Sequence, residues 1–288
     1  MQYFVDSRFG CDDNDGLTPI TPWQSLEKIN ATTFLPGDEI LLATDSVFEG
    51  QLHPKGDGSA DAPIRIRSYG GGQKPCIDGC GSHGTREGNF LEGAAVLFFN
   101  QNYWEVEGLE ITNYNPRFKQ PFFHALEPHN ADGTIMQYNE VCYTHGVQDG
   151  QAFDIDISCN DTTIRYNYSH DNEGGFLLLM YRTRNNDIHH NISEYDRNGL
   201  IWNHENDGGT RIHDNLFYLG MEDVQVFRGP FDSDDWVFEN NTFYAPEPNT
   251  EIEWRPRAKY IGNNYYNIKT LPNDPNARCE KPDFTPSR

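Results

Sequence analysis

Paired carboxylates are the first residues in this sequence that could do chemistry. Asp154 and Asp156 stand two residues apart in the alternating segment Phe153-Asp154-Ile155-Asp156, which predicts a strand with both acids on one face. Two carboxyl groups that flank one glycosidic bond are what a glycoside hydrolase requires. Further acids that neighbouring strands could bring to this pair are Glu173, Glu205, Asp207 and Glu253. Because alternation creates such pairs in any acidic sheet, solvated or cation-binding carboxylates are the simpler interpretation.

Histidines gather in the middle of the chain, and one of them is placed to contact a ligand. His204 precedes Glu205 near the exposed end of a predicted strand. His170, His189 and His190 belong to turn sequences that recur along the chain, so we interpret them as structural. The spacing of the histidines does not define a metal triad.

The segment 11–16 is rich in hard oxygen ligands. Its aspartates Asp12, Asp13 and Asp15 could hold calcium, although an Asx-rich turn explains the same residues. The six cysteines lack paired Cys-X-X-Cys spacing, which argues against a zinc site made of cysteines. Disulfides are possible between Cys142 and Cys159 and between Cys76 and Cys80, and buried free thiols explain these residues equally well.

The elements that must position these side chains repeat about every two dozen residues. An apolar residue followed three positions later by Asn recurs six times, and successive Asn residues are 28, 24, 24, 25 and 24 positions apart. This period is typical of a solenoid whose coils hydrogen-bond to one another. Asn tolerates the left-handed conformation of a corner, and its amide can bond the Asn of the next coil. The predicted inward ladder consists of Asn139, Asn167, Asn191, Asn215, Asn240 and Asn264.

A second strand in each coil carries the candidate site, and alternation assigns its side chains to two faces. The residues predicted to face inward are Phe153, Ile155, Phe176, Leu178, Leu200, Trp202, Val224, Val226, Ile252 and Trp254. The residues predicted to face outward are His124, Asp154, Asp156, Leu177, Leu179, Ile201, Asn203, Gln225, Phe227, Glu253 and Arg255.

The sequence therefore predicts an all-β chain, a right-handed parallel β-helix that forms a single domain over residues 1–288. An amphipathic segment at 22–30 begins with a proline and predicts a helix that caps the N-terminal end of the solenoid. Residues 269–288 are rich in proline and charge and predict a loosely packed tail. No linker divides the chain.

Several motifs resemble a known superfamily. The opening coils, with GLTPITPWQSLEKIN, APIRIRSYGG and KPCIDG, look like those of pectate-lyase-like β-helix proteins. DGQAFDIDIS and IRYNYSHDNEGGFLL are similar to a secreted subgroup from polysaccharide-degrading bacteria. The resemblance implies a carbohydrate-active β-helix, and the superfamily includes lyases, hydrolases, epimerases and xylanase-associated carbohydrate-binding modules that do not catalyse. The NTDG…DD…GHG…RIK series of polygalacturonases is absent from the sequence.

Charge narrows the choice of partner. The chain has 22 basic and 44 acidic residues, a net charge of −22, which argues against nucleic acid and anionic membranes. The negative net charge also argues against a polyuronate as ligand. Because no lysine occurs between Lys119 and Lys259, a lyase would need an arginine as its base. No apolar run is long enough to span a membrane. No signal peptide precedes the first predicted strand, and an extracellular polymer as ligand favours a chain that begins after a removed signal.

The remaining interpretation is a carbohydrate platform. The rise per coil nearly matches one pyranose unit, so consecutive coils can contact consecutive sugars. Apolar side chains on the outward face require a cover, either a sugar ring or the loop 113–133. The predicted ligand-binding residues are Asp154, Asp156, Tyr181, Asn203, His204, Glu205, Gln225, Phe227 and Arg228.

We therefore predict a secreted carbohydrate-binding module for a plant cell-wall polysaccharide, neutral or lightly charged and similar to xylan, with a larger multidomain glycan-degrading enzyme as its parent protein. The first alternative is a glycoside hydrolase that uses Asp154, Asp156 and Glu205. The second is a calcium-dependent polysaccharide lyase.

Overall fold

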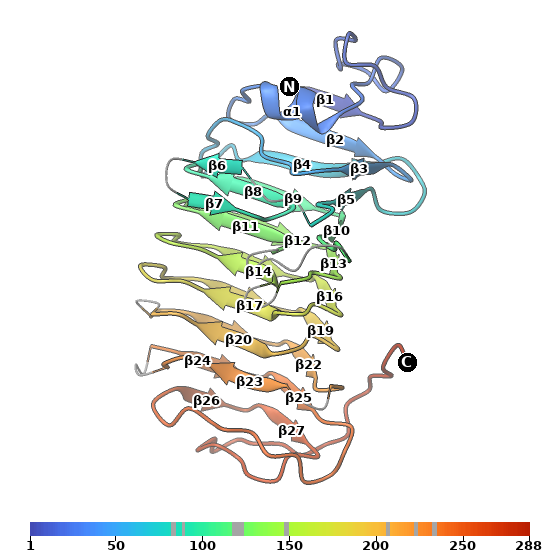
Figure 1. Cartoon of the computed structure of the whole chain (residues 1–288). Coiled ribbons are helices and arrows are strands. Elements are labelled where there is room, and N and C mark those ends of the chain that lie inside the picture. Colours follow the sequence, from blue (N-terminus) through green and yellow to red (C-terminus); the bar gives the residue numbers. More distant parts are fainter. Residues whose placement is uncertain are drawn as a thin grey trace.

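The chain folds into a right-handed parallel β-helix, as the sequence predicts. The computed structural model describes all residues except 82–84, 88–89, 117–123, 147–149, 206–207, 222–223 and 232–234, and of residues 82–92 it describes the backbone strands alone. Each central coil passes through three strands that belong to three different parallel sheets. Figure 1 shows the coils stacked along one axis from the N-terminal end to the C-terminal end.

The first sheet contains β1 (Gln2–Val5), β2 (Glu39–Ala43), β4 (Ile64–Tyr69), β9 (Trp104–Glu107), β12 (Ile135–Gln137), β15 (Thr163–Arg165), β18 (Asp187–His189), β21 (Arg211–His213), β24 (Val237–Glu239) and β26 (Lys259–Ile261). The second sheet contains β3 (Val47–Glu49), β5 (Cys76–Asp78), β10 (Glu110–Thr112), β13 (Glu140–Cys142), β16 (Tyr168–His170), β19 (Ile192–Glu194), β22 (Leu216–Tyr218), β25 (Thr242–Tyr244) and β27 (Asn264–Tyr266). The third sheet contains β8 (Val96–Phe99), β11 (Leu126–His129), β14 (Gln151–Ile155), β17 (Gly175–Leu179), β20 (Gly199–Asn203) and β23 (Gln225–Arg228). The strands β6 (Thr85–Glu87) and β7 (Phe90–Glu92) form an antiparallel hairpin.

A short helix, α1 (Leu26–Ala31), lies at the N-terminal end of the stack (Figure 1). It begins later than the predicted segment 22–30 because Ser25 is its N-cap and accepts a hydrogen bond from the backbone N–H of Lys28. Leu26 and Ile29 pack into the core of the first coils. Within the described residues, no helix has the length and apolar character needed to cross a membrane.

The C-terminal tail, residues 269–288, contains no strand but contacts the solenoid at two levels. Asp274 accepts hydrogen bonds from the backbone N–H groups of Gly262 and Asn263, at 2.8 and 2.9 Å. Further along, Ser287 and Arg288 bond Glu194 and Asp171 on the second-sheet side. In Figure 1 the tail therefore runs back alongside the last coils instead of ending at the bottom of the stack.

Register between coils decides which side chains form the core. Phe153, Leu177, Ile201 and Phe227 occupy equivalent positions on β14, β17, β20 and β23, and all four belong to the apolar core. The predictions that Leu177, Ile201 and Phe227 face outward are therefore wrong, as is the outward prediction for Leu179, which is also part of the core. A shift of one position in the alignment reverses every face of a strand.

The reverse error affects the neighbouring positions. The predictions that Leu178 and Trp202 face inward are wrong. Leu178 pairs with Asp154, and Trp202 pairs with Leu178, so both share the outward column of Asp154. The Arg228 guanidinium lies over the Trp202 ring. Alternation misleads here because the core also contains Phe176 and Leu200, so two consecutive side chains are buried at the start of each strand. At Gly175 the backbone has a φ of 120°, outside the strand region, and regular alternation begins only after it. Residues 252–255, expected to extend this sheet, form no strand.

The structure contains the predicted ladder of asparagine residues, but two of its six members differ from the prediction. The backbone N–H of each member donates to the side-chain oxygen of the next member at 2.9–3.1 Å. At the two Asn-Asn pairs the ladder uses Asn241 and Asn263, not Asn240 and Asn264 as predicted. Its members are Asn139, Asn167, Asn191, Asn215, Asn241 and Asn263, and Asp274 ends it.

The left-handed conformation at each corner belongs to the residue before the ladder Asn. Tyr138, Tyr166, His190, Asp214 and Asn240 have φ values between 53° and 56°. The side chain of each ladder Asn points inward. In Asn167, for example, the side-chain N–H groups donate to the Met136 carbonyl and to Oδ1 of Asn191. The left-handed corner and the ladder position thus belong to neighbouring residues, which explains why Asn240 was mistaken for Asn241. In the last coil the corner residue is Gly262, with a φ of 66°, and Asn264 follows the ladder residue Asn263.

We predict that Asn191→Ala lowers the free energy of unfolding by about 2–3 kcal/mol, since it removes the side-chain acceptor of the Asn167 N–H groups and the donor to the Ile164 carbonyl, all of them buried. Asn240→Gly is the matched control, because Asn240 is exposed and its φ of 53° suits glycine. Its free energy of unfolding should change by less than about 0.5 kcal/mol. Urea unfolding followed by circular dichroism measures both, and equal losses would show that the ladder contributes nothing specific.

Candidate active site on the outward face of the third sheet

Two consecutive coils bring acids and histidines together on the outward face of the third sheet. Leu126 on β11 pairs with Phe153 on β14. The same register places Glu127 beside Asp154 and His129 beside Asp156, because side chains two residues apart share a face. His124 lies just before β11 and reaches Asp154. We call these five residues the carboxylate cluster: His124, Glu127, His129, Asp154 and Asp156.

Each of the two aspartates contacts a histidine ring. Nε2 of His124 lies 3.1 Å from Oδ2 of Asp154, and Nδ1 of His129 lies 2.5 Å from Oδ2 of Asp156. Glu127 lies between them, since its carboxylate is within 4.8 Å of ligand atoms of both pairs. The Phe99 ring stacks on His129 with a centroid separation of 4.5 Å. The three carboxyl groups therefore share one small volume.

The cluster is buried, and burial sets its electrostatics. Its five side chains belong to residues that are 1–7% exposed. Burial lowers the pKa of His124 to about 4, against smaller opposing effects of the Asp156 charge and the Gln151 side chain. His124 is therefore neutral at pH 7 and supplies no positive charge to the cluster. Three buried carboxyl groups this close favour a shared proton or a bound cation over three full charges.

The same atoms are suited to hold a metal ion. The described residues contain two overlapping sets of three possible ligands here, His124 with Glu127 and Asp154, and Glu127 with His129 and Asp156. Carboxylate oxygens and imidazole nitrogens together suit several divalent ions. Glu127, common to both sets, is the residue on which either a shared proton or a cation would depend.

The structure assembles only part of the predicted site. Asp154 and Asp156 face outward as predicted, but their partners are Glu127, His124 and His129 and not Glu205. Glu205 lies two coils further along and is exposed at a corner, with a φ of 62°. Among the other acids considered, Glu173 contacts His145 at 2.9 Å, and Asp207 lies outside the described residues.

The predicted ligand-binding residues separate into three groups. Phe227 is 1% exposed and packs against Phe238 and Phe243 in the core, so its predicted contact with sugar is wrong. Asn203 is buried and its amide donates to the Pro230 carbonyl. Residues that remain at the surface or half-buried are Tyr181, His204, Glu205, Gln225 and Arg228. Of these, Arg228 lies 3.7 Å from the centroid of the Trp202 ring, which the sequence analysis had placed inside.

The aspartates of segment 11–16 hold turns together. Asp12 accepts hydrogen bonds from the backbone N–H groups of Gln24 and Ser25 and from the Ser25 hydroxyl, which orders the start of α1. Asp15 accepts from Leu17 and Thr21. These hydrogen bonds are those of an Asx-rich turn, and calcium binding by Asp12, Asp13 and Asp15 stays a prediction. The six cysteines are free thiols.

Sequence reasoning missed Glu127 and His129, although a signal exists. His129 and Asp156 are 27 residues apart, as are Glu127 and Asp154, which is one coil. A search for acids and histidines separated by one coil would have found both.

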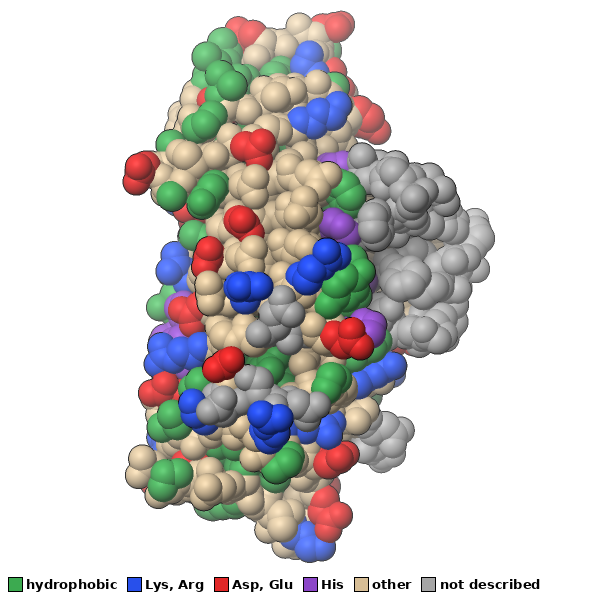
Figure 2. Space-filling model, turned by 90° about the vertical axis from the view of Figure 1, so that its left-hand side faces the viewer, with side chains coloured by type: hydrophobic (Ala, Val, Ile, Leu, Met, Phe, Trp, Pro, Cys, Tyr) green, Lys and Arg blue, Asp and Glu red, His purple; other side chains and the backbone are tan. Residues whose placement is uncertain are grey.

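Figure 2 shows histidine side chains gathered at the borders of the face it presents, whereas acidic and basic side chains are interspersed over the rest.

Comparisons with known proteins agree with this architecture. No family model matches the chain. A lacto-N-biosidase from Bifidobacterium longum is 39% identical in an alignment 154 residues long, which covers 46% of this chain and 10% of that protein. The match thus spans about a tenth of the length of this curated relative.

Solved structures with the same fold include polysaccharide lyases. A rhamnogalacturonan lyase has a TM-score of 0.69 at 11% identity, over 92% of this chain and 74% of that one. The pectate lyase Pel9A has a TM-score of 0.61 at 13% identity, over 93% of this chain and 69% of that one. These likenesses confirm the pectate-lyase-like β-helix fold, and the likeness to xylanase-associated modules stays a prediction.

The low pKa of His124 predicts a specific loss of stability in acid. The folded state keeps the ring neutral down to about pH 4, whereas the unfolded chain takes up a proton near pH 6.5. The wild type should therefore lose roughly 2 kcal/mol more than His124→Gln between pH 7 and pH 4.5. Urea unfolding of both proteins at the two pH values measures the difference, and parallel losses would contradict the assignment.

Proposed function

We propose that this chain is a β-helical glycoside hydrolase, or the β-helical part of a larger one, whose catalytic carboxyl groups are those of Glu127, Asp154 and Asp156. The observation that carries the proposal is the burial of three carboxyl groups from two consecutive coils within one small volume. Solvated acids of an acidic surface would not be buried together, because their mutual repulsion and desolvation destabilise the fold. Buried groups of like charge that destabilise the fold are typical of functional sites.

The arrangement assigns a role to each group. The neutral His124 ring donates a hydrogen bond to Asp154, which stabilises that carboxylate as an anion able to attack the anomeric carbon. Glu127, flanked by two carboxyl groups, is the group that gains most from holding a proton and is assigned as the general acid. His129 contacts Asp156 and orients the second aspartate. Glu127 then acts as the base that activates water in the second step.

The substrate class follows from charge and from the relative. A net charge of −22 favours a neutral glycan over a polyuronate. The matched relative is by name a biosidase, and biosidases cut glycans. Trp202, His204 and Arg228 continue the outward face beyond the cluster and would contact further sugar units. The proposal includes an extracellular site of action.

The observation that favoured a binding module, the predicted outward row of apolar and aromatic side chains, does not hold in the structure. The apolar side chains predicted to need a cover on the outward face, Leu177, Leu179, Ile201 and Phe227, belong to the core. Among the described aromatic residues, Tyr181 and Trp202 are partly exposed. Binding without cleavage is accordingly an outcome of the tests below and not a second proposal.

We predict that Glu127→Gln, Asp154→Asn and Asp156→Asn each lower the rate of hydrolysis about 100-fold or more, because each removes a proton donor, nucleophile or orienting charge without changing its volume. The assay follows reducing ends released from xylan, neutral oligosaccharides including lacto-N-type sugars, pectin and alginate. Glu205→Gln is the control, since Glu205 is exposed two coils away.

Three outcomes would contradict this prediction. Wild type that releases no sugar but is retarded by a glycan, with Trp202→Ala weakening retention, would favour a binding module. Products that absorb as unsaturated sugars would favour a lyase. Loss of hydrolysis on treatment with a chelator, restored by calcium, would show that the cluster acts as a metal site.

The close approach of the carboxyl groups also predicts the stereochemistry. One oxygen of Glu127 and one of Asp154 lie within 4.8 Å of each other, which matches the short separation of about 5–5.5 Å in retaining enzymes better than the wider spacing of inverting ones. The first product observed by proton NMR should therefore keep the anomeric configuration of the substrate. An inverted first product would remove the nucleophile role from Asp154.

A further inference from the structure

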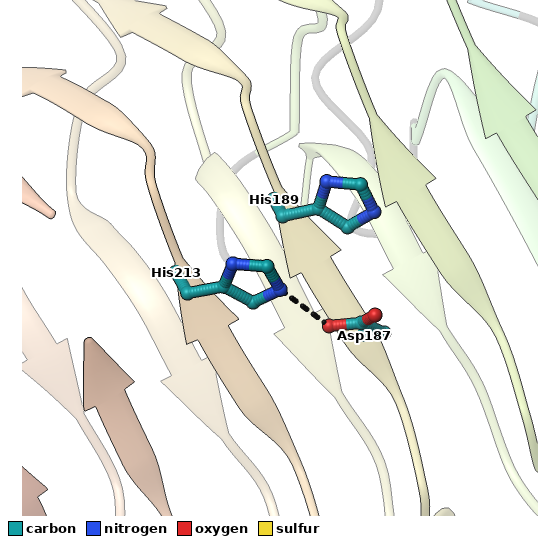
Figure 3. Close-up of side chains that lie close together, drawn as sticks. All are labelled: Asp187, His189 and His213. Atoms are coloured by element: carbon teal, nitrogen blue, oxygen red, sulfur yellow. Dashed lines mark hydrogen bonds and ion pairs between the residues drawn. The ribbon is translucent and has the colours of Figure 1, made fainter. Parts of the chain in front are cut away.

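A second cluster of ligating side chains lies on the outward face of the first sheet. Asp187 and His189 are two residues apart on β18, and His213 on β21 is directly opposite His189 in the register. Figure 3 shows the two rings side by side on adjacent strands, with Asp187 beside the His213 ring. The ring centroids are 4.8 Å apart and the ring planes differ by 12°. One nitrogen of each ring and one oxygen of Asp187 lie within 4.8 Å of one another.

The His213 ring has a carboxylate at both nitrogens. Its Nε2 lies 2.9 Å from Oδ1 of Asp187, and its Nδ1 lies 2.6 Å from Oδ2 of Asp214. A neutral imidazole carries one N–H and can donate to only one of them. The second contact requires either another proton or a cation between nitrogen and oxygen. In metal-ligating histidines, one nitrogen binds the ion and the other donates to a carboxylate, which is the geometry that Asp214 provides.

The His189 ring is also prepared to act as a ligand. Its Nδ1 lies 2.8 Å from Nδ1 of His190, which leaves Nε2 as the other ring nitrogen. Arg211 and Arg165 stand beside Asp187 and His189 in the register. Arg211 donates a hydrogen bond to Glu239 at 2.6 Å, and Arg165 donates one to Gln137 at 2.8 Å.

We propose that Asp187, His189 and His213 bind a divalent transition-metal ion of the Zn²⁺ type, which joins two consecutive coils. Two imidazoles and one carboxylate are a recurrent zinc ligand set, and a partly exposed site leaves the fourth position to water. One nitrogen of each ring and one oxygen of Asp187 would hold the ion. Because the ligands meet only in the folded chain, binding stabilises the folded state. The site lies on a different sheet from the carboxylate cluster and does not depend on the proposed hydrolysis.

Titration of the tag-free protein with Zn²⁺ by calorimetry, and with Co²⁺ by visible absorption, tests the proposal. We expect one ion per chain and a higher thermal midpoint when Zn²⁺ is present. His213→Ala and Asp187→Asn should weaken Zn²⁺ binding by more than about tenfold, since even indirect partners of a ligand contribute that much. Asp214→Asn should weaken it by about tenfold while all three ligands remain, which identifies Asp214 as a positioning residue.

Matched controls distinguish this site from others. His204→Ala removes an exposed histidine of the third sheet, and Glu127→Gln alters the carboxylate cluster, so both should bind Zn²⁺ as the wild type does. Circular dichroism confirms that each variant is folded. Wild type that binds no Zn²⁺, ligand variants that bind it unchanged, or loss of binding in Glu127→Gln would each overturn the proposal.

Discussion

Hydrogen bonding between consecutive coils, in register, is the constraint on which the rest of this structure depends. Each strand takes its partners from the coil before and the coil after, so a position in one coil has an equivalent neighbour about 4.8 Å away in the next. The apolar columns of the core follow from it, and so does the ladder from Asn139 to Asn263. A side chain in this fold is therefore best understood together with the residues one coil before and after it.

Both sites use that constraint to bring like groups together. In the third sheet it places Glu127 beside Asp154 and His129 beside Asp156. In the first sheet it places His189 beside His213. Such contacts would be unfavourable between isolated charges, and the hydrogen bonds of the coils and the burial of apolar columns supply the stability that maintains them. The need of such groups for a proton or a cation that neutralises their charge is the physical reason that we propose functions for both sites.

The orientation of a few aromatic and aliphatic side chains changes the functional argument. With Phe227 and Ile201 outward, the third sheet would be a platform for sugar rings. With these side chains in the core, its outward face carries acids and histidines, followed by Leu178, Trp202 and Arg228. The chemistry available on that face is then acid–base and nucleophilic, which suits bond cleavage better than binding alone.

The sequence by itself determined the fold class, the coil period, the ladder as far as Asn215 and the outward position of Asp154 and Asp156, because these features repeat or alternate locally. Tertiary structure decided the phase of β17, β20 and β23, the exchange of Asn240 for Asn241, and the meeting of Glu127 with both aspartates. A local pattern carries no information on the one-residue shift between coils, and that shift sets which side chains share a face. Because the coils differ in length, packing and hydrogen bonding between coils decide this shift.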